Sequence, residues 1–341
     1  MEQRVLGKTG RDASIIGLGT WQLGADWGSV TEPDALAVLS AAVESGVTFL
    51  DTADVYGDGR SERIIGRFLA ANPGHGIVVA TKMGRRVEQV LENYTLANFR
   101  AWTDRSRVNL GVDRLDLVQL HCPPTPVYYS GAVYDALDTL AAEGRIAAYG
   151  VSVETCEQAL AAIAHPGVAS VQIIFNAFRR KPLDQVLPAA AAAGVGVIVR
   201  VPLASGLLSG RYTIDTVFAA DDHRNYNRHG EAFDIGETFS GVDYATGVRA
   251  AGEFAAIVAE PGAFDGAGDR AIGERATTAQ AALRWVTQQP GVTTVIPGAR
   301  NPEQARQNAA AAALPPLSEH ALREIEELYD KYFRAEIHSR W

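Results

Sequence analysis

The sequence predicts an α/β fold built as a closed (β/α)8 barrel, also called a TIM barrel. Two observations lead to this expectation: short apolar runs alternate with helical patterns along the chain, and eight such units fit within 341 residues. Length alone would also fit two small domains. No internal repeat or second domain is visible, so residues 1–341 are expected to form a single barrel domain.

A β-hairpin is expected before the barrel, over residues 4–14, with Thr9-Gly10 as its turn. The barrel strands follow as short apolar runs. They are expected at residues 14–19, 47–52, 77–82, 115–121, 146–152, 169–176, 196–203 and 292–297.

Helices are expected between these strands. Thr31-Glu-Pro-Asp opens the first one because threonine is a favourable N-cap, and it ends near Ser45-Gly46; Ser61-Glu62 opens the next. Further helices are expected at residues 96–109, 132–143, 157–165, 183–193, 277–289 and 302–312, with a final amphipathic helix at 318–333.

The alternation of strands and helices is interrupted by residues 212–270, a long loop after the seventh strand. It is far longer than ordinary connections, which are about four to six residues. It is rich in charged and aromatic residues and contains a predicted helix at 244–259. Such a segment on a barrel is typically a lid or a binding loop.

Charge and composition limit the kinds of partner and the compartment that the protein is expected to have. A net charge of −9 argues against nucleic acid or an anionic membrane surface, because both attract basic patches. No basic, apolar signal segment precedes "MEQRVLGKTG", and no apolar run approaches membrane-spanning length. Cys122 and Cys156 show no metal-ligand spacing and fit a reducing compartment. A cytoplasmic protein without a bound metal is therefore expected, while its oligomeric state leaves no signal.

Polar residues stand at the ends of successive predicted strands. In a (β/α)8 barrel these ends meet at one rim, where active sites lie. Each residue alone has a structural interpretation, such as an ion pair or a satisfied core histidine. Together they predict one concave site. The residues are Asp51, Lys82, His121, Ser152, Gln172, Asn176 and Arg200.

The residue types at this rim indicate a reaction. Tyr56 follows Asp51 in a glycine-bounded loop, and a phenol with a pKa near 10 is a poor acid at neutral pH. A Lys82 ammonium at about 4 Å would attract the phenolate by about 4 kcal/mol at an effective dielectric of about 20, which is expected to lower the phenol pKa. Asp51 would hold Lys82, and His121 would orient a carbonyl oxygen. A hydride for that carbonyl must come from a cofactor.

The order of several motifs resembles the aldo-keto reductases over nearly the whole chain. The motifs are "LGKTGRDASIIGLGTW", "DTADVYG", "TK", "LVQLHCPP", "GRIAAYGVS", "PLASGLLSGRY" and "VIPGARNPEQARQN". The resemblance implies a (β/α)8 barrel, NADP(H) as cofactor, and reduction of a small carbonyl substrate or oxidation of a sugar or alcohol in reverse. It also implies a catalytic tetrad of Asp51, Lys82, His121 and Tyr56, with Tyr56 as proton donor.

The resemblance also implies the cofactor contacts. A Rossmann fingerprint is rejected, because its third glycine would stand where the chain has Gln22. Helix N-termini bind anions well, and one follows the last strand. Gly19, Thr20, Trp21, Ser152, Gln172 and Arg200 are expected near the nicotinamide; Leu203, Ser205 and Arg211 at the pyrophosphate; Arg300 and Gln304 at the 2′-phosphate; and Gln307 and Asn308 at the adenine. Asp51 and Gly298 are expected as further cofactor contacts.

The chain departs from the family pattern at three positions. Val153 replaces an asparagine, Gln307 a glutamate, and Arg200 the aromatic residue that stacks on the nicotinamide. Arg200 could stack on the ring and favour NADPH over NADP, since a cation repels the oxidised ring. The alternative is a salt bridge that turns Arg200 away, for example to the long segment.

Two other functions remain open from the sequence. The same fold serves as a cofactor-binding regulatory subunit of ion channels, which turnover would exclude. A metal enzyme using Asp222 and His223 is disfavoured, because adjacent residues make a poor ligand set. The substrate pocket is expected to include Trp21, Trp27, Tyr56 and Phe175. The physiological substrate and the direction of the reaction leave no sequence signal.

Overall fold

Eight parallel strands form the centre of the fold in the computed structural model, which describes residues 1–24, 30–74, 76–266 and 276–341. Hydrogen-bonded neighbours follow chain order from β3 to β10. Parallel bridges from Ile16 to Val295 and from Gly19 to Gly298 join the first strand to the last and close the barrel. The strands are β3 (Leu18–Gly19), β4 (Phe49–Asp51), β5 (Val78–Met83), β6 (Leu115–His121), β7 (Ile146–Ser152), β8 (Val168–Ile174), β9 (Gly196–Arg200) and β10 (Thr294–Val295).

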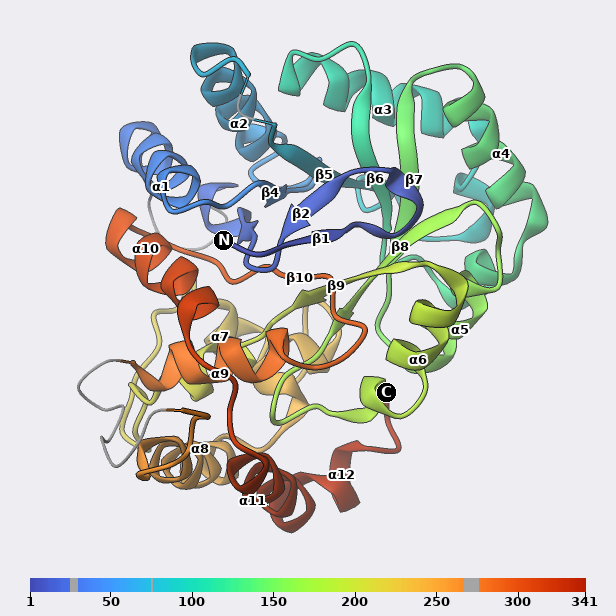
Figure 1. Ribbon diagram of the computed structural model, residues 1–341. Coiled ribbons are helices and arrows are strands. Elements are labelled where there is room, and N and C mark those ends of the chain that lie inside the picture. The colour runs from blue at the N-terminus through green and yellow to red at the C-terminus, as the bar shows by residue number, and fades with distance from the viewer. Residues whose placement is uncertain (25–29, 75, 267–275) are drawn as a thin grey trace.

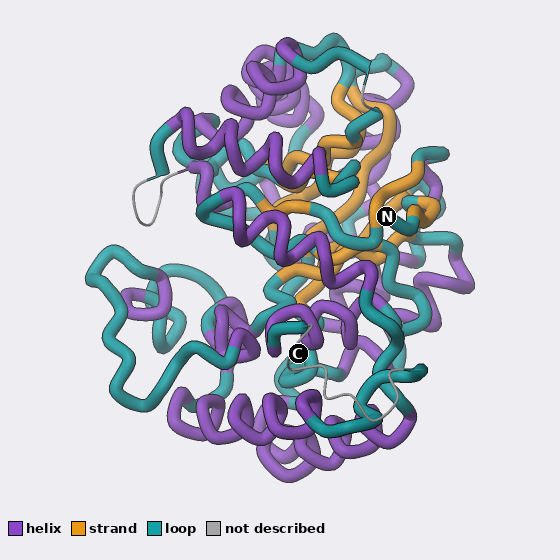
Figure 2. The backbone as a smooth tube through the Cα atoms, turned by 60° about the vertical axis from the view of Figure 1, so that its left-hand side comes forward, coloured by secondary structure: helices purple, strands orange, loops and turns teal. Residues whose placement is uncertain are grey.

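Helices surround these strands (Figure 1, Figure 2). Several begin at the caps that the sequence predicts: Thr31 Oγ1 accepts from Asp34 N, and Thr277 forms a capping box. The helices of the barrel are α1 (Glu32–Glu44), α2 (Arg60–Ala71), α3 (Leu96–Leu110), α4 (Gly131–Ala142), α5 (Cys156–Ile163), α6 (Val186–Ala193), α9 (Thr278–Thr287) and α10 (Pro302–Ala310). The predicted (β/α)8 barrel is confirmed.

The predicted hairpin is also present, and it covers the amino-terminal end of the barrel. Strand β1 (Gln3–Val5) pairs antiparallel with β2 (Asp12–Ser14). Leu6 and Ala13 are fully buried and belong to the apolar cluster inside the barrel, which also contains Leu117 and Ile198. Apolar side chains therefore fill this end, and the polar rim lies at the other.

The long segment has its own local structure. It contains α7 (His223–Tyr226), short 3-10 turns at Ile235–Glu237 and Phe239–Gly241, and α8 (Tyr244–Ala259), whose bounds are those predicted. Helix α8 packs against α11 (Glu319–Tyr329), as Figure 1 shows at its lower edge. The predicted final helix is regular only to Tyr329, because residues 330–334 form a π turn before α12 (Ala335–Ile337).

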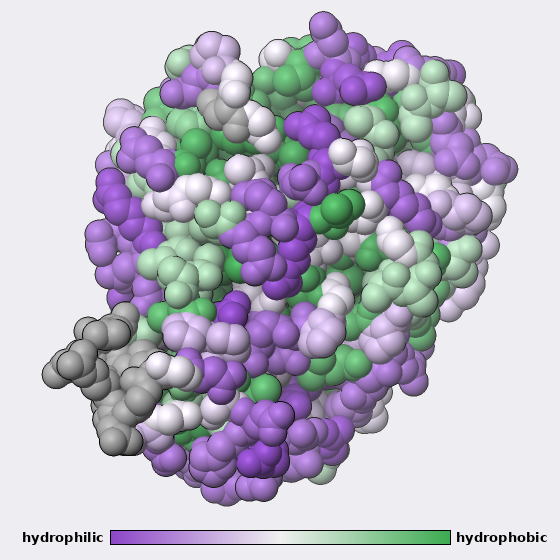
Figure 3. Space-filling model, viewed as in Figure 1, coloured by the Kyte–Doolittle hydropathy of each residue, from purple (hydrophilic) through white to green (hydrophobic). Residues whose placement is uncertain are grey.

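The surface carries both hydrophobic and hydrophilic side chains. Figure 3 shows hydrophobic residues scattered among hydrophilic ones on the face that carries the hairpin. Over the described ranges, the structure has no helix that is long and apolar enough to cross a membrane.

Candidate active site

A cavity of about 320 Å³ opens at the carboxyl end of the barrel strands. Asp51 ends β4 and Gln172 lies near the end of β8, and both side chains line the cavity together with Tyr56 and Arg200. Lys82 and His121 stand at the ends of β5 and β6 and are almost fully buried beside them. The strand-end pattern therefore gathers these residues at one site.

Lys82 links two of the neighbouring side chains. Its ammonium forms a buried ion pair with Asp51 Oδ1 and donates to Thr52 O at 2.9 Å and to Tyr56 Oη at 3.4 Å. Burial is the largest influence and lowers the pKa of Lys82, but Asp51 and Tyr56 together outweigh burial and hold the pKa above its usual value. Lys82 is therefore a fixed positive charge at the tyrosine hydroxyl.

The second oxygen of Asp51 is held from the other side of the barrel. Gln172 Nε2 donates to Oδ2 at 2.7 Å, and Gln119 Nε2 donates to the same atom at 3.2 Å. Gln119 was missed by the sequence reasoning, although it stands two residues before His121 and so on the same face of β6. Because it donates to Asp51, the Gln172 amide positions Lys82 indirectly.

Tyr56 keeps its proton in this environment. Burial raises the pKa of Tyr56, and the nearby Lys82 lowers it by less, so the pKa lies above 10. Lys82 lowers this pKa as expected, but the net shift is upward, because the expectation left out the cost of burying a phenolate. A protonated phenol is the form that can donate.

His121 is an uncharged neighbour of this phenol. Its ring meets the Tyr56 ring edge to face, with centroids 6.0 Å apart. Burial, and then the positive charges of Arg85, Lys82 and Arg200, hold the pKa of His121 well below its usual value. Within the described residues, His121 Nδ1 is buried and has no hydrogen-bond partner.

A second carboxyl group, that of Asp54, stands two residues before Tyr56. Its side chain is fully buried, and neither oxygen has a hydrogen-bond partner in the described part of the chain. Burial and the Glu62 charge raise the pKa of Asp54 to about 7, against the opposing effect of Arg86 and Arg105. The folded protein thus binds this proton more tightly than the unfolded chain does.

We expect Asp54→Asn to stabilise the fold at alkaline pH. Between the unfolded pKa of 3.8 and the folded pKa of about 7, the folded state binds more protons, so the free energy of unfolding falls as pH rises. At about 1.4 kcal/mol per pKa unit, the ionised carboxylate costs up to about 4 kcal/mol. Urea unfolding at about pH 8 should show the gain, and unfolding near pH 4 should show little. A similar gain for the exposed neighbour Asp58→Asn would contradict this assignment.

Aromatic side chains form one wall of the cavity. Trp21 stacks on Tyr56 with centroids 6.3 Å apart and contacts the rings of His223 and Phe233. Trp27 lies outside the described residues. Phe175 does not line the cavity: it is fully buried and packs on Trp285. The prediction of a pocket role for Phe175 is wrong because side chains alternate along the strand, and Phe175 continues the helix-facing side with Val171 and Ile173.

Most of the predicted cofactor residues line one continuous cleft. The first cavity shares Leu203, Gly298 and Gln304 with a second cavity of about 520 Å³. The predicted residues in the first are Gly19, Thr20, Trp21, Asp51, Gln172, Arg200, Leu203, Ser205, Gly298, Arg300 and Gln304. Those in the second also include Arg211, Gln307 and Asn308.

Ser152 differs from this set. It is 1% exposed and does not line either cavity; its hydroxyl lies 3.3 Å from Cys122 Sγ. This geometry does not support the predicted direct carboxamide contact, because the Ser152 hydroxyl is buried away from the cleft, where it accepts from Cys122 Sγ. Gly19 packs closely against the end of the last strand, because a Cβ atom there would lie 2.8 Å from Ile296 O.

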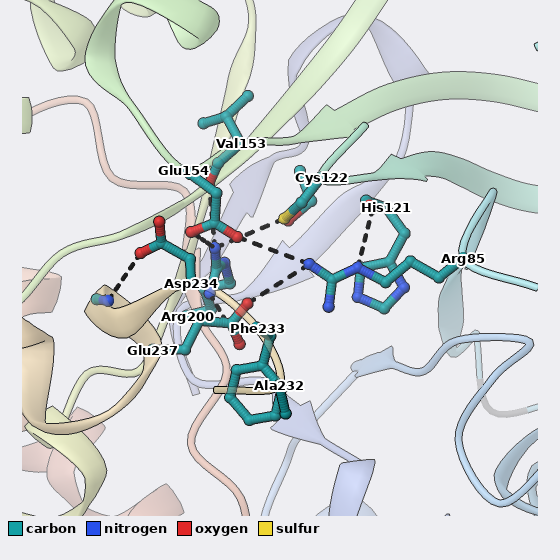
Figure 4. Close-up of polar contacts among 12 residues, drawn as sticks. Arg85, His121, Cys122, Val153, Glu154, Arg200, Ala232, Phe233, Asp234 and Glu237 are labelled. Atoms are coloured by element: carbon teal, nitrogen blue, oxygen red, sulfur yellow. Dashed lines mark hydrogen bonds and ion pairs between the residues drawn. The ribbon is translucent and has the colours of Figure 1, made fainter. Parts of the chain in front are cut away.

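Arg200 takes part in an ion-pair cluster. Its guanidinium donates to Glu154 Oε2 at 2.9 Å and lies 3.4 Å from Glu237 Oε2 (Figure 4). Arg85 lies 3.7 Å from a carboxylate oxygen of each glutamate. The salt bridge to the long segment, which the sequence analysis gave as the alternative, is present. Arg200 also lines the cavity, so the stacking of its guanidinium on the nicotinamide stays a prediction.

The long segment supplies cavity residues that no sequence motif indicated. Tyr212, His223, Arg224 and Glu237 line the first cavity. Asp222 forms a two-pronged pair with Arg224, at 2.8 and 2.6 Å. This pairing occupies the carboxylate that a metal site in the segment would need. The only available signal was the unusual length and charge of the segment.

The fold and the rim site together define a class: (β/α)8-barrel oxidoreductases that act on carbonyl or alcohol groups. The Aldo/keto reductase family model matches residues 15–330, and the chain belongs to this family.

Individual relatives agree with this assignment. The aldo-keto reductase YhdN of Bacillus subtilis is 29% identical over 308 residues, covering 89% of this chain and 86% of the relative. Among solved structures, the glycerol dehydrogenase AKR11B4 from Gluconobacter oxydans has a TM-score of 0.75 and 27% identity, covering 97% of this chain and 95% of its own. An aldo-keto reductase from Klebsiella pneumoniae in complex with NADPH has a TM-score of 0.69 and 24% identity, with 96% of each chain covered, and shows the shared fold.

Proposed function

We propose that the protein is an NADP(H)-dependent oxidoreductase that reduces aldehydes or ketones to alcohols, or oxidises sugars or alcohols in reverse. One observation carries the proposal: the Lys82 ammonium is bonded to both Asp51 and the Tyr56 hydroxyl, beside a long cleft. This arrangement is suited to proton donation onto a carbonyl oxygen.

The cleft suits a dinucleotide in its length and chemistry. Near Tyr56 it is lined by the Trp21 ring and by Gly19. Farther along, Arg211 and Arg300 offer guanidinium groups for phosphates, and Gln307 and Asn308 offer amides for a base. The Klebsiella pneumoniae relative binds NADPH, which supports the choice of cofactor. When bound, the nicotinamide supplies or accepts the hydride.

Residues of the chain carry out the proton transfer. Tyr56 Oη gives its proton to the carbonyl oxygen, and Lys82 at 3.4 Å stabilises the phenolate that remains. Asp51 keeps Lys82 charged and in place. The neutral His121 ring orients the carbonyl oxygen with a ring nitrogen, and it adds no positive charge of its own.

A spectrophotometric screen tests this function. Purified protein is mixed with NADPH and a series of aldehydes and ketones, and with NADP and a series of polyols and aldoses. Oxidation of NADPH or reduction of NADP with any of them supports the enzyme. Tight NADPH binding without turnover on any substrate would instead support a cofactor-binding regulatory role.

We expect Arg300→Ala to weaken NADPH binding by about 1–3 kcal/mol while leaving NADH binding nearly unchanged, because the guanidinium would bond the 2′-phosphate that only NADPH carries. Arg300 lines the cleft just before α10. Arg306→Ala is the matched control, since Arg306 is exposed on the same helix and does not line the cleft. Equal weakening of both cofactors in fluorescence titrations would give Arg300 a purely structural role.

A further inference from the structure

The cluster around Arg200 places one carboxylate in the substrate end of the cavity. Of the two glutamates that contact Arg200, Glu237 lines the cavity with Tyr56 and Trp21, whereas Glu154 does not. The Glu237 charge also raises the pKa of the Tyr56 phenol. A molecule bonded to the Tyr56 hydroxyl therefore occupies a cavity that Glu237 also lines.

Hydrogen bonds to two loops of the barrel hold the turn that carries Glu237. Ser205 Oγ donates to Glu237 O at 2.9 Å and accepts from Phe239 N at 3.0 Å, which ties the turn of the long segment to the loop after β9. Asn176 Nδ2, at the end of β8, donates to Ser240 Oγ at 2.8 Å. A side chain on a turn held this firmly can discriminate between substrates.

Glu237 remains negatively charged and keeps acceptor capacity. Burial is the largest influence and raises the pKa of Glu237, but Arg200, Arg85 and a hydrogen bond with the Glu154 side chain together hold the pKa below its usual value. The contacts with both arginines are long, at 3.4 and 3.7 Å. A carboxylate has about four lone-pair sites, so its oxygens can still accept from a bound hydroxyl.

The same cluster does not suit a metal ion, although Cys122, Glu154 and Glu237 bring ligand atoms within 4.8 Å of one another. Burial raises the pKa of the Cys122 thiol to about 12, so it is not a thiolate. Arg85 and Arg200 already bring two positive charges to the glutamates, as Figure 4 shows. The cluster is better explained as a recognition site.

We infer that Glu237 determines substrate specificity: it accepts hydrogen bonds from the hydroxyl groups of neutral, hydroxylated carbonyl substrates and repels substrates that carry a carboxylate. This inference rests on the proposed function. Arg200 also lines the cavity, but its guanidinium is committed to Glu154 and to Val153 O at 3.1 Å. Like charges placed side by side at a binding site oppose binding, whereas a paired guanidinium adds little attraction.

The charge test compares butanal with succinic semialdehyde, which carries a carboxylate in place of the methyl group. In Glu237→Gln, the ratio of kcat/KM for succinic semialdehyde to that for butanal should rise by about tenfold or more over the wild type. The hydroxyl test compares glyceraldehyde with propanal. In Glu237→Ala, the ratio of kcat/KM for glyceraldehyde to that for propanal should fall several-fold, because the glyceraldehyde hydroxyls lose their acceptor.

Glu154→Gln is the matched control. It removes a carboxylate from the same two arginines, keeps a side chain that can bond to Glu237, and leaves Glu237 in the cavity lining. A purely structural role for the cluster predicts that both Gln variants change all four substrates by a common factor. Such a common factor, or a shift in the affinity for NADPH with unchanged ratios, would overturn the inference. Turnover of butanal by the wild type tests the proposed function separately, because butanal carries neither a hydroxyl group nor a charge.

Discussion

Replacing Tyr56 with phenylalanine should lower the rate of carbonyl reduction by about 10²-fold or more, the usual size of a general-acid effect. The variant loses only the hydroxyl that lies 3.4 Å from Lys82 Nζ. Lys82 keeps its ion pair with Asp51 and its bond to Thr52 O, so the fold should be preserved. The ring also remains, so the contact with Trp21 is retained.

The measurement pairs turnover with cofactor affinity. Steady-state rates should collapse in Tyr56→Phe, while NADPH binding, followed by fluorescence, should stay within about twofold of the wild type, since a hydroxyl contributes only modestly to binding. Tyr134→Phe is the control, because it removes a buried hydroxyl, bonded to Tyr128 O at 3.3 Å, that does not line the cavity. A Tyr56→Phe enzyme that retains most of its activity would remove the phenol from the proton step.

The strands in the middle of the chain could be predicted closely. Residues 115–121 and 146–152 were expected as strands, and β6 and β7 have these bounds. They are apolar runs with marked ends, and each pairs with neighbours along most of its length. The first and last strands were predicted too long, at 14–19 and 292–297. They meet through isolated bridges where the barrel closes, so few of their residues form a regular ladder.

Within the site, residues placed by strand ends were the predictable part. Asp51, Lys82 and His121 converge because parallel strands end at one rim. The sign of the Tyr56 pKa shift was not predictable, because it depends on how far burial outweighs Lys82. Only a folded structure gives that balance.

The two glutamates that pair with Arg200 could not be identified from the sequence. Glu154 follows the end of β7, but Glu237 comes from a 3-10 turn in a segment without hydrophobic periodicity. Such a segment folds through side-chain contacts with the barrel, as the bond from Ser205 to Glu237 O illustrates. Local pattern therefore cannot place its residues, and the specificity role proposed for Glu237 needed the folded chain.

Lys82→Met should abolish activity and also destabilise the fold, which separates it from Tyr56→Phe. The activity falls because the phenolate left by proton transfer loses its neighbouring cation. The stability falls because Asp51 is 2% exposed and its Oδ1 atom loses its counter-ion, and removing one partner of a buried pair costs about 3–5 kcal/mol. Donation from Gln119 and Gln172 to the other oxygen keeps the loss near the lower end.

A double variant gives the decisive comparison. Adding Asp51→Asn to Lys82→Met removes the stranded charge, so urea unfolding should recover much of the lost stability, while carbonyl reduction stays absent. Asp51→Asn alone should also be unstable, because it leaves the Lys82 ammonium buried without its carboxylate. Equal unfolding midpoints for Lys82→Met and Tyr56→Phe, or no recovery in the double variant, would mean that Asp51 and Lys82 are not energetically coupled. In that case Asp51 could not be the group that keeps Lys82 charged beside the phenol.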